Sequence, residues 1–165
     1  MSYRIPVAAP WITEAEVQAV AEAARSGYVS RGPAVEQFES AFAQRIGVRY
    51  AVSVANGTAA VEVALRCLGL EGREVLTTPH SCAATLLGIL HAGAMPRFAD
   101  VSRADGNLDP EQTEARLTPA TAAILAVHCY GRACNVDELS EIARKRRIPL
   151  IEDCAMSLGA VSREN

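Results

Sequence analysis

A regular alternation of short apolar runs with helix-forming segments begins at Tyr50 and limits this chain to one class of fold. Most connections between these segments are only a few residues long. Strands that alternate with helices over short connections build a sheet wrapped by helices. We therefore predict an α/β fold, with a helical segment over residues 1–48 and a series of βα units over residues 49–165.

Local signals set the expected bounds of the elements. Thr13 and Glu16 form a capping box, and Pro33 suits the first turn of a helix. Gly27 and Gly47 then end these two helices. Helices are predicted over 14–25, 33–46, 58–68, 83–91, 110–117 and 136–147, and strands over 51–54, 74–78, 95–99, 122–127 and 149–152.

The composition indicates a single globular domain, because 50% of the 165 residues are hydrophobic and 21% are charged. A net charge of -3 argues against a nucleic-acid-binding surface. The N-terminus has no apolar run of signal-peptide length, and no segment approaches the roughly 20 apolar residues that a membrane-spanning helix needs. A cytoplasmic location is therefore expected, without nucleic-acid or membrane partners.

The cysteines favour reduced thiols over disulfides, because their number is odd and no secretion signal accompanies them. Their spacings match no zinc motif. Cys129 and Cys134 beside His128 are the nearest approach to one, but four ligands are not visible, so no metal site is predicted. The five cysteines are Cys67, Cys82, Cys129, Cys134 and Cys154.

Asn56-Gly57-Thr58 lies at a predicted strand-to-helix turn and has the character of a phosphate-binding turn. A glycine lets the backbone approach an anion, and the free N–H groups of a helix start attract negative charge. Thr58 adds a hydroxyl donor. The same residues also suit ordinary helix capping, so both interpretations stay open. The chain has neither a G-x-G-x-x-G nor a G-x-x-x-x-G-K-[ST] motif, which favours a phosphate-bearing cofactor other than a dinucleotide or nucleoside triphosphate.

Glu152-Asp153 follows the apolar run Pro149-Leu150-Ile151, which is typical of a buried strand. Sheets of this class bind ligands beyond the carboxyl ends of their strands. A carboxylate at such a position can keep the ring nitrogen of pyridoxal phosphate protonated. A helix cap or an ordinary loop residue is the alternative for Asp153.

Pyridoxal phosphate enzymes also use a lysine, and Lys145 is the only lysine of the chain. It lies within Arg144-Lys145-Arg146-Arg147, at the predicted C-terminal end of a surface helix. Cations are favoured there by the helix dipole, so a structural role is predicted for Lys145. The three histidines, His80, His91 and His128, are likewise interpreted as structural, because no second catalytic group is spaced beside them.

Several motifs in the same order and at the same spacing resemble the DegT family of pyridoxal-phosphate sugar aminotransferases. The resemblance implies an aspartate-aminotransferase-like large domain of fold type I, with three α/β/α layers. It covers nearly the whole chain but only the N-terminal part of a typical member, so the domain is expected to be incomplete. The motifs are Gly27-Tyr28-Val29-Ser30-Arg31-Gly32-Pro33, Asn56-Gly57-Thr58-Ala59-Ala60, Gly93-Ala94-Met95-Pro96-Arg97-Phe98-Ala99-Asp100-Val101, Val127-His128-Cys129-Tyr130-Gly131, and Ile151-Glu152-Asp153-Cys154-Ala155 with Gly159-Ala160.

By this resemblance, Gly57 and Thr58 bind the phosphate of pyridoxal 5'-phosphate, and Asp153 pairs with its pyridine nitrogen. Cys82 or Ala83 occupies the position of a residue, often aromatic, that lies against the ring. Met156 stands where the family commonly has a glutamine or histidine, and a thioether is a poor substitute for their polar contact. The Schiff-base lysine of the family is expected beyond Asn165, so no residue of this chain is assigned a catalytic role.

The resemblance implies that an amino group passes from a donor such as glutamate to a nucleotide-linked keto-sugar, in the synthesis of surface polysaccharides or secondary metabolites. It also implies a homodimer for the complete enzyme. Two alternatives stay open. Some members are dehydratases with a histidine in place of the lysine, and a truncated or complementing chain would bind partners or ligands without catalysis. The 165 residues alone are expected to be inactive.

Overall fold

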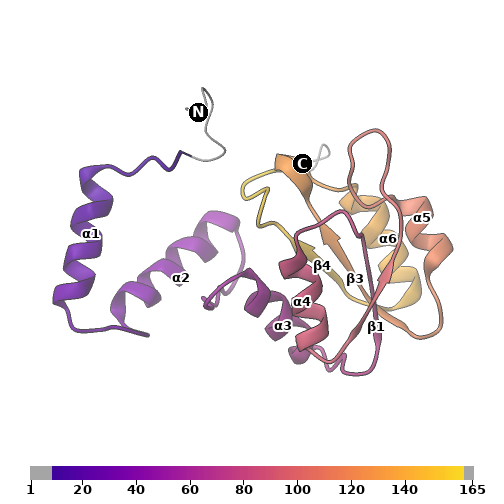
Figure 1. The fold of residues 1–165 in the computed structure, drawn as a ribbon, viewed down its shortest axis with the longest axis horizontal. Coiled ribbons are helices and arrows are strands. Elements are labelled where there is room, and N and C mark those ends of the chain that lie inside the picture. Colours follow the sequence, from indigo (N-terminus) through magenta and orange to yellow (C-terminus); the bar gives the residue numbers. More distant parts are fainter. Residues whose placement is uncertain (1–8, 162–165) are drawn as a thin grey trace, which may run out of the picture. The chain divides into compact units, whose positions relative to one another are not determined.

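The computed structural model describes residues 9–161, which fall into two compact units divided between Ser53 and Val54. Residues 1–8 and 162–165 of the predicted domain lie outside the described residues. The first unit contains the helices α1 (Glu14–Arg25) and α2 (Pro33–Ile46), drawn in indigo and purple in Figure 1. The predicted capping box opens α1, and Gly47 with a φ of 80° ends α2. The local signals that predicted these two helices are confirmed.

The second unit contains the alternating strands and helices, whose observed bounds differ from the predicted ones by one residue at most. Ala83–His91 has the predicted bounds. The elements in chain order are α3 (Gly57–Cys67), β1 (Glu74–Thr77), α4 (Ala83–His91), β2 (Met95–Phe98), α5 (Pro110–Arg116), β3 (Thr121–Val127), the short 3-10 helix η1 (Cys129–Gly131), α6 (Val136–Arg146) and β4 (Leu150–Asp153).

The four strands form a parallel sheet in the order β2-β1-β3-β4. Every residue of the central strand β3 is buried. Its alternate side chains serve two cores: Leu125 packs with α3 and α4 on one face, and Ile124 packs with α6 on the other. This arrangement gives three layers, and Figure 1 shows the helices on the two sides of the strands. The predicted α/β architecture is confirmed.

One predicted strand is wrong, because residues 51–54 are not a strand. Val52 is 75% exposed, and among the described strands none pairs with this segment. Ser53 instead donates hydrogen bonds from its N–H and its hydroxyl to the Glu39 carboxylate, both at 2.8 Å. A β-strand exists only where a neighbour accepts its backbone hydrogen bonds, so an apolar run alone is not sufficient.

None of the helices among residues 9–161 is both long enough and apolar enough to cross a bilayer.

Candidate functional site

The sheet has a topological switch point between β1 and β3. The chain leaves β1 and enters α4, which packs in the core that contains α3. It leaves β3 and enters α6, which packs in the core on the opposite face. Neighbouring parallel strands whose connections diverge in this way leave a crevice beyond their carboxyl ends, where α/β proteins bind ligands. The candidate site is therefore expected at this edge.

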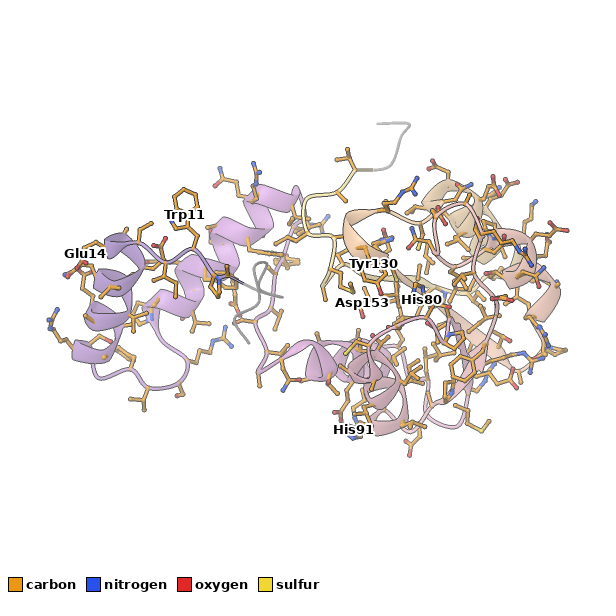
Figure 2. The ribbon with its side chains drawn as sticks, turned by 45° about the horizontal axis from the view of Figure 1, so that its top comes forward. Trp11, Glu14, His80, His91, Tyr130 and Asp153 are labelled. Carbon is orange, nitrogen blue, oxygen red and sulfur yellow. The ribbon has the colours of Figure 1, made fainter. Side chains whose placement is uncertain are left out.

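Asp153, the last residue of β4, lies at this edge and is half-buried. Its Oδ2 accepts a hydrogen bond from the Thr85 hydroxyl at 2.8 Å, and its Oδ1 accepts one from the Ala155 N–H at 3.1 Å. Figure 2 shows Asp153 in the same region as His80 and Tyr130, which follow β1 and β3. The sequence-predicted carboxylate is thus held in a defined orientation at the carboxyl edge.

The helix α4 connects this carboxylate with the start of α3. Thr85, in the first turn of α4, contacts Asp153, and Gly88 lies one turn further along the helix. A Cβ built on Gly88 would lie 2.7 Å from Val61 Cβ and 2.9 Å from the Thr58 carbonyl oxygen. Only a glycine permits so close an approach of the two helices. The carboxylate and the phosphate-type turn are therefore positioned by the same helix.

The N-terminus of α3 presents free donors. Asn56 caps the helix, because its Oδ1 accepts from the Ala59 N–H at 2.9 Å. The N–H groups of Gly57 and Thr58 and the Thr58 hydroxyl donate to no other described residue. A Cβ built on Gly57 would meet nothing within 4 Å, so the space beside this backbone is open. Free N–H groups at a helix start form a site for an anion.

His128 holds together the ends of β3 and β4. Its Nδ1 accepts from the Cys134 N–H at 2.9 Å, and its Nε2 lies 2.9 Å from the Glu152 carboxylate. Because the Nδ1 accepts, the proton of the neutral ring is on Nε2 and is donated to Glu152. The backbone N–H of His128 also donates to the Asp153 carbonyl at 3.1 Å. Both ring nitrogens of this buried histidine thus contact groups of the protein, and its structural role stays a prediction.

One group of side chains within residues 9–161 has the composition of a metal site: His128, Glu152 and Cys154, whose ligand atoms lie within 4.8 Å of one another. The tautomer of His128 opposes metal binding, because the Nε2 that faces Glu152 carries a proton and has no free lone pair. Burial, and then the neighbouring carboxylates, raise the pKa of the Cys154 thiol. A metal ion would therefore have to displace the proton of His128 Nε2 and that of the Cys154 thiol to bind here.

Cys82 and Ala83 lie at the start of α4, where Cys82 is the N-cap residue and Ala83 the first helical residue. Both are exposed, and they precede Thr85 by three and two residues. Met156 is 45% exposed and follows β4 by three residues. In the sequence, these three residues therefore lie close to Thr85 and Ala155, which hold Asp153. Their contacts with a ligand stay predictions.

Lys145 lies in the last turn of α6 and forms an ion pair with Glu141 at 3.0 Å. Its side chain is 58% exposed. An exposed lysine at the end of a helix matches the structural role predicted for it.

Three further residues lie at this edge: Thr85, which sequence analysis did not single out, Tyr130, which it noted only as part of a motif, and His80, which it interpreted as structural. Thr85 was missed because its partner Asp153 is 68 residues away along the chain. Tyr130 has a φ of 53°, in the left-handed region that non-glycine residues rarely adopt. Its ring lies 5.8 Å from that of His80, whose Nδ1 is 2.9 Å from the Gly106 carbonyl oxygen. Such backbone strain is concentrated at functional sites.

Residues 10–165 match the model of the DegT/DnrJ/EryC1/StrS aminotransferase family. The spore coat polysaccharide biosynthesis protein SpsC of Bacillus subtilis is 40% identical over 152 residues, or 92% of this chain. A dTDP-3-amino-3,4,6-trideoxy-alpha-D-glucose transaminase of Micromonospora megalomicea is 41% identical over 87% of this chain. The chain spans 39% of the length of each of these two relatives.

Solved structures agree with the sequence relatives. An aminotransferase from Psychrobacter cryohalolentis matches 92% of this chain with a TM-score of 0.88 and 38% identity, and the match covers 39% of that chain. A GDP-4-keto-6-deoxy-D-mannose-3-dehydratase from E. coli, with bound hydrated pyridoxal phosphate, matches 97% of this chain with a TM-score of 0.88 and 29% identity, over 43% of its own length. The predicted fold type I is confirmed. The chain belongs to the DegT/DnrJ/EryC1/StrS aminotransferase family.

Proposed function

We propose that this chain is the N-terminal, cofactor-binding part of a pyridoxal-phosphate-dependent aminotransferase that transfers an amino group to a nucleotide-linked keto-sugar. One observation carries the proposal: the helix α4 contacts both the Asp153 carboxylate, through Thr85, and the open start of α3, through Gly88. These residues fit a ligand that has a phosphate at one end and a basic ring nitrogen at the other.

In this proposal the N–H groups of Gly57 and Thr58 and the Thr58 hydroxyl bind the phosphate, since all three lack partners among the described residues. Asp153 faces the ring nitrogen and keeps its proton in place. Cys82 and Ala83 border the ring, and Met156 replaces a polar contact with an apolar one. The bound cofactor supplies an electron sink for a carbanion next to the transferred nitrogen.

The relatives support the class of substrate. One is named as a transaminase of a dTDP-linked sugar and another as a protein of spore coat polysaccharide biosynthesis. We therefore propose an amino acid donor such as glutamate, a nucleotide-sugar acceptor, and a homodimer in the complete cytoplasmic enzyme. The catalytic lysine is expected beyond Asn165, in the part of the relatives that this chain does not span.

Binding of pyridoxamine phosphate to the purified chain tests the cofactor assignment, because this form of the cofactor binds without a lysine. We expect saturable binding by calorimetry, and Asp153→Ala should weaken it about tenfold or more, since a charged hydrogen bond is lost. Asp137→Ala, a substitution at an exposed position of α6, is the matched control and should bind normally. The absence of binding, or equal binding by Asp153→Ala, would contradict the proposal.

The amino transfer is tested with a protein that joins this chain to the lysine-bearing segment of the family. Glutamate should convert the absorption of bound pyridoxal phosphate into that of pyridoxamine phosphate, and a keto-sugar nucleotide should reverse the change. A cofactor-loaded protein that is inert to amino donors would contradict an aminotransferase.

A dehydratase is the second candidate, because the matched dehydratase of E. coli has the same TM-score as the matched aminotransferase of P. cryohalolentis. The resemblance predicts a histidine at the lysine position in that case. Loss of a hydroxyl group from the sugar, without net transfer of nitrogen from glutamate, would identify this branch.

A further inference from the structure

We propose that Thr85 is a positioning residue that fixes the Asp153 carboxylate for its contact with the cofactor ring nitrogen, an inference that rests on the proposed function. Thr85 belongs to α4, is only 3% exposed and donates to Asp153 Oδ2 at 2.8 Å. The contact joins residues that are 68 positions apart in the chain. It is a tertiary hydrogen bond, distinct from the local caps that open the helices of this chain.

The hydrogen bonds around Thr85 have a fixed direction. The Ser81 hydroxyl lies 2.9 Å from Thr85 Oγ1, and a threonine hydroxyl has a single proton. Since an ionised carboxylate can only accept, the Thr85 proton is donated to Asp153, and Thr85 accepts from Ser81. Each bond in such a chain polarises and strengthens the next. The hydrogen bonds are therefore donated from Ser81 to Thr85 and from Thr85 to Asp153.

This contact and the Ala155 N–H together occupy one position on each carboxylate oxygen. An aspartate side chain with one donor can turn about its terminal torsion, which has a broad energy minimum. A second donor on a β-branched side chain within a helix resists this rotation, because few χ1 rotamers are allowed there. Gly88 holds the same helix against Thr58, so Thr85 fixes the carboxylate relative to the phosphate-type turn.

The test compares Thr85→Val, which keeps the shape but removes the hydroxyl, with Thr85→Ser, which keeps the hydroxyl. For pyridoxamine phosphate we expect about a tenfold loss of affinity with Thr85→Val and at most a threefold loss with Thr85→Ser. Ser81→Ala should give an intermediate loss. Benzyl phosphate has no ring nitrogen, so its affinity should be the same for wild type and Thr85→Val. A purely structural role for Thr85 would weaken both ligands equally.

A double-substitution cycle distinguishes the loss of carboxylate positioning from a general loss of folded protein. In an Asp153→Ala background, Thr85→Val should cause no further loss of pyridoxamine phosphate affinity, because the group that it positions is gone. Losses that multiply in the double variant, or equal affinity of wild type and Thr85→Val, would overturn the role of Thr85.

Crystal structures of wild type and Thr85→Val test the same point without a cofactor. The Asp153 carboxylate should change its orientation in the variant, and an unchanged carboxylate would overturn the inference. If wild type fails to bind pyridoxamine phosphate while the carboxylate turns in Thr85→Val, the proposed function fails and the positioning contact stands.

Discussion

At Gly88, the helices α3 and α4 approach each other so closely that no room is left for a side chain. A Cβ on Gly88 would lie 2.7 Å from Val61 Cβ and 2.9 Å from the Thr58 carbonyl oxygen, and neither neighbour is a flexible side-chain end. We predict that Gly88→Ala lowers the free energy of unfolding by about 1–3 kcal/mol, the usual effect of overpacking a core. Chemical denaturation measures this change.

Gly57→Ala is the matched control for the Gly88 substitution, because an added Cβ there meets nothing within 4 Å. Its free energy of unfolding should stay within about 1 kcal/mol of wild type. Alanine favours a helix more than glycine does, so without a close contact Gly88→Ala would be more stable than wild type, by up to about 1 kcal/mol. A variant that is more stable than wild type would therefore contradict the close approach of the two helices.

Cys134 carries the largest resolved change of pKa in the described part of the chain. Burial raises the pKa of its thiol from the ordinary value of 9.0 to about 12. Its Sγ lies 3.3 Å from the Val127 carbonyl oxygen, to which the thiol donates. We predict that Cys134 reacts with a thiol reagent at about pH 8 far more slowly than the exposed Cys82, since the thiolate is the reactive form.

The same change of pKa predicts a pH dependence of stability. Below the unfolded-state pKa of 9.0, the thiol is protonated in the folded and in the unfolded protein. Its contribution to the free energy of unfolding is then fully present. As the pH rises from there to about 12, the unfolded thiol ionises first, so the free energy of unfolding falls. The fall should be smaller in Cys134→Ala. An identical pH profile in wild type and variant would contradict the buried, protonated thiol.

At the scale of elements, helices could be predicted from nearby residues, whereas the strand predicted over residues 51–54 could not. The helices were predicted to within one residue because their start signals, such as the N-cap Thr13 and Pro33 in the first turn, act over one turn. Residues 51–54 have the composition of a strand but pair with no described strand. A helix satisfies its own backbone, whereas a strand depends on a neighbour that can be far away in the sequence.

Hydrogen exchange tests this difference between the two segments. The backbone N–H groups of residues 51–54 should exchange much faster than those of β3, which is buried along its whole length and pairs on both sides. The α4 amides serve as an internal reference, since a helix has its own hydrogen bonds. Protection of residues 51–54 equal to that of β3 would show that this segment is paired in solution.

The candidate site shows the same division at the level of contacts. Gly57, Thr58 and Asp153 could be proposed as site residues from the sequence because each belongs to a short motif next to a helix or strand end. The contact between Thr85 and Asp153 could not be identified, since it depends on the packing of α4 beside β4 in the folded chain. The strained backbone of Tyr130 had no sequence signal either.

At the scale of the molecule, the second unit brings three separate segments to one edge of a parallel sheet: the start of α3, the start of α4 and the end of β4. The relatives extend well beyond this chain, which spans about two fifths of their length. The part described here therefore contains the groups that we assign to the cofactor, and the proposed reaction requires the remainder.

The most direct test of the central claim is the 15N NMR shift of ring-labelled pyridoxamine phosphate bound to the chain. It is measured at a pH where the free compound has lost its ring proton. Asp153 should keep the bound nitrogen protonated, because a neighbouring carboxylate favours the charged ring, and Asp153→Ala should abolish this signal. A bound ligand with an unprotonated ring nitrogen, or the same protonated signal in Asp153→Ala, would contradict the assignment of this edge as a pyridoxal phosphate site.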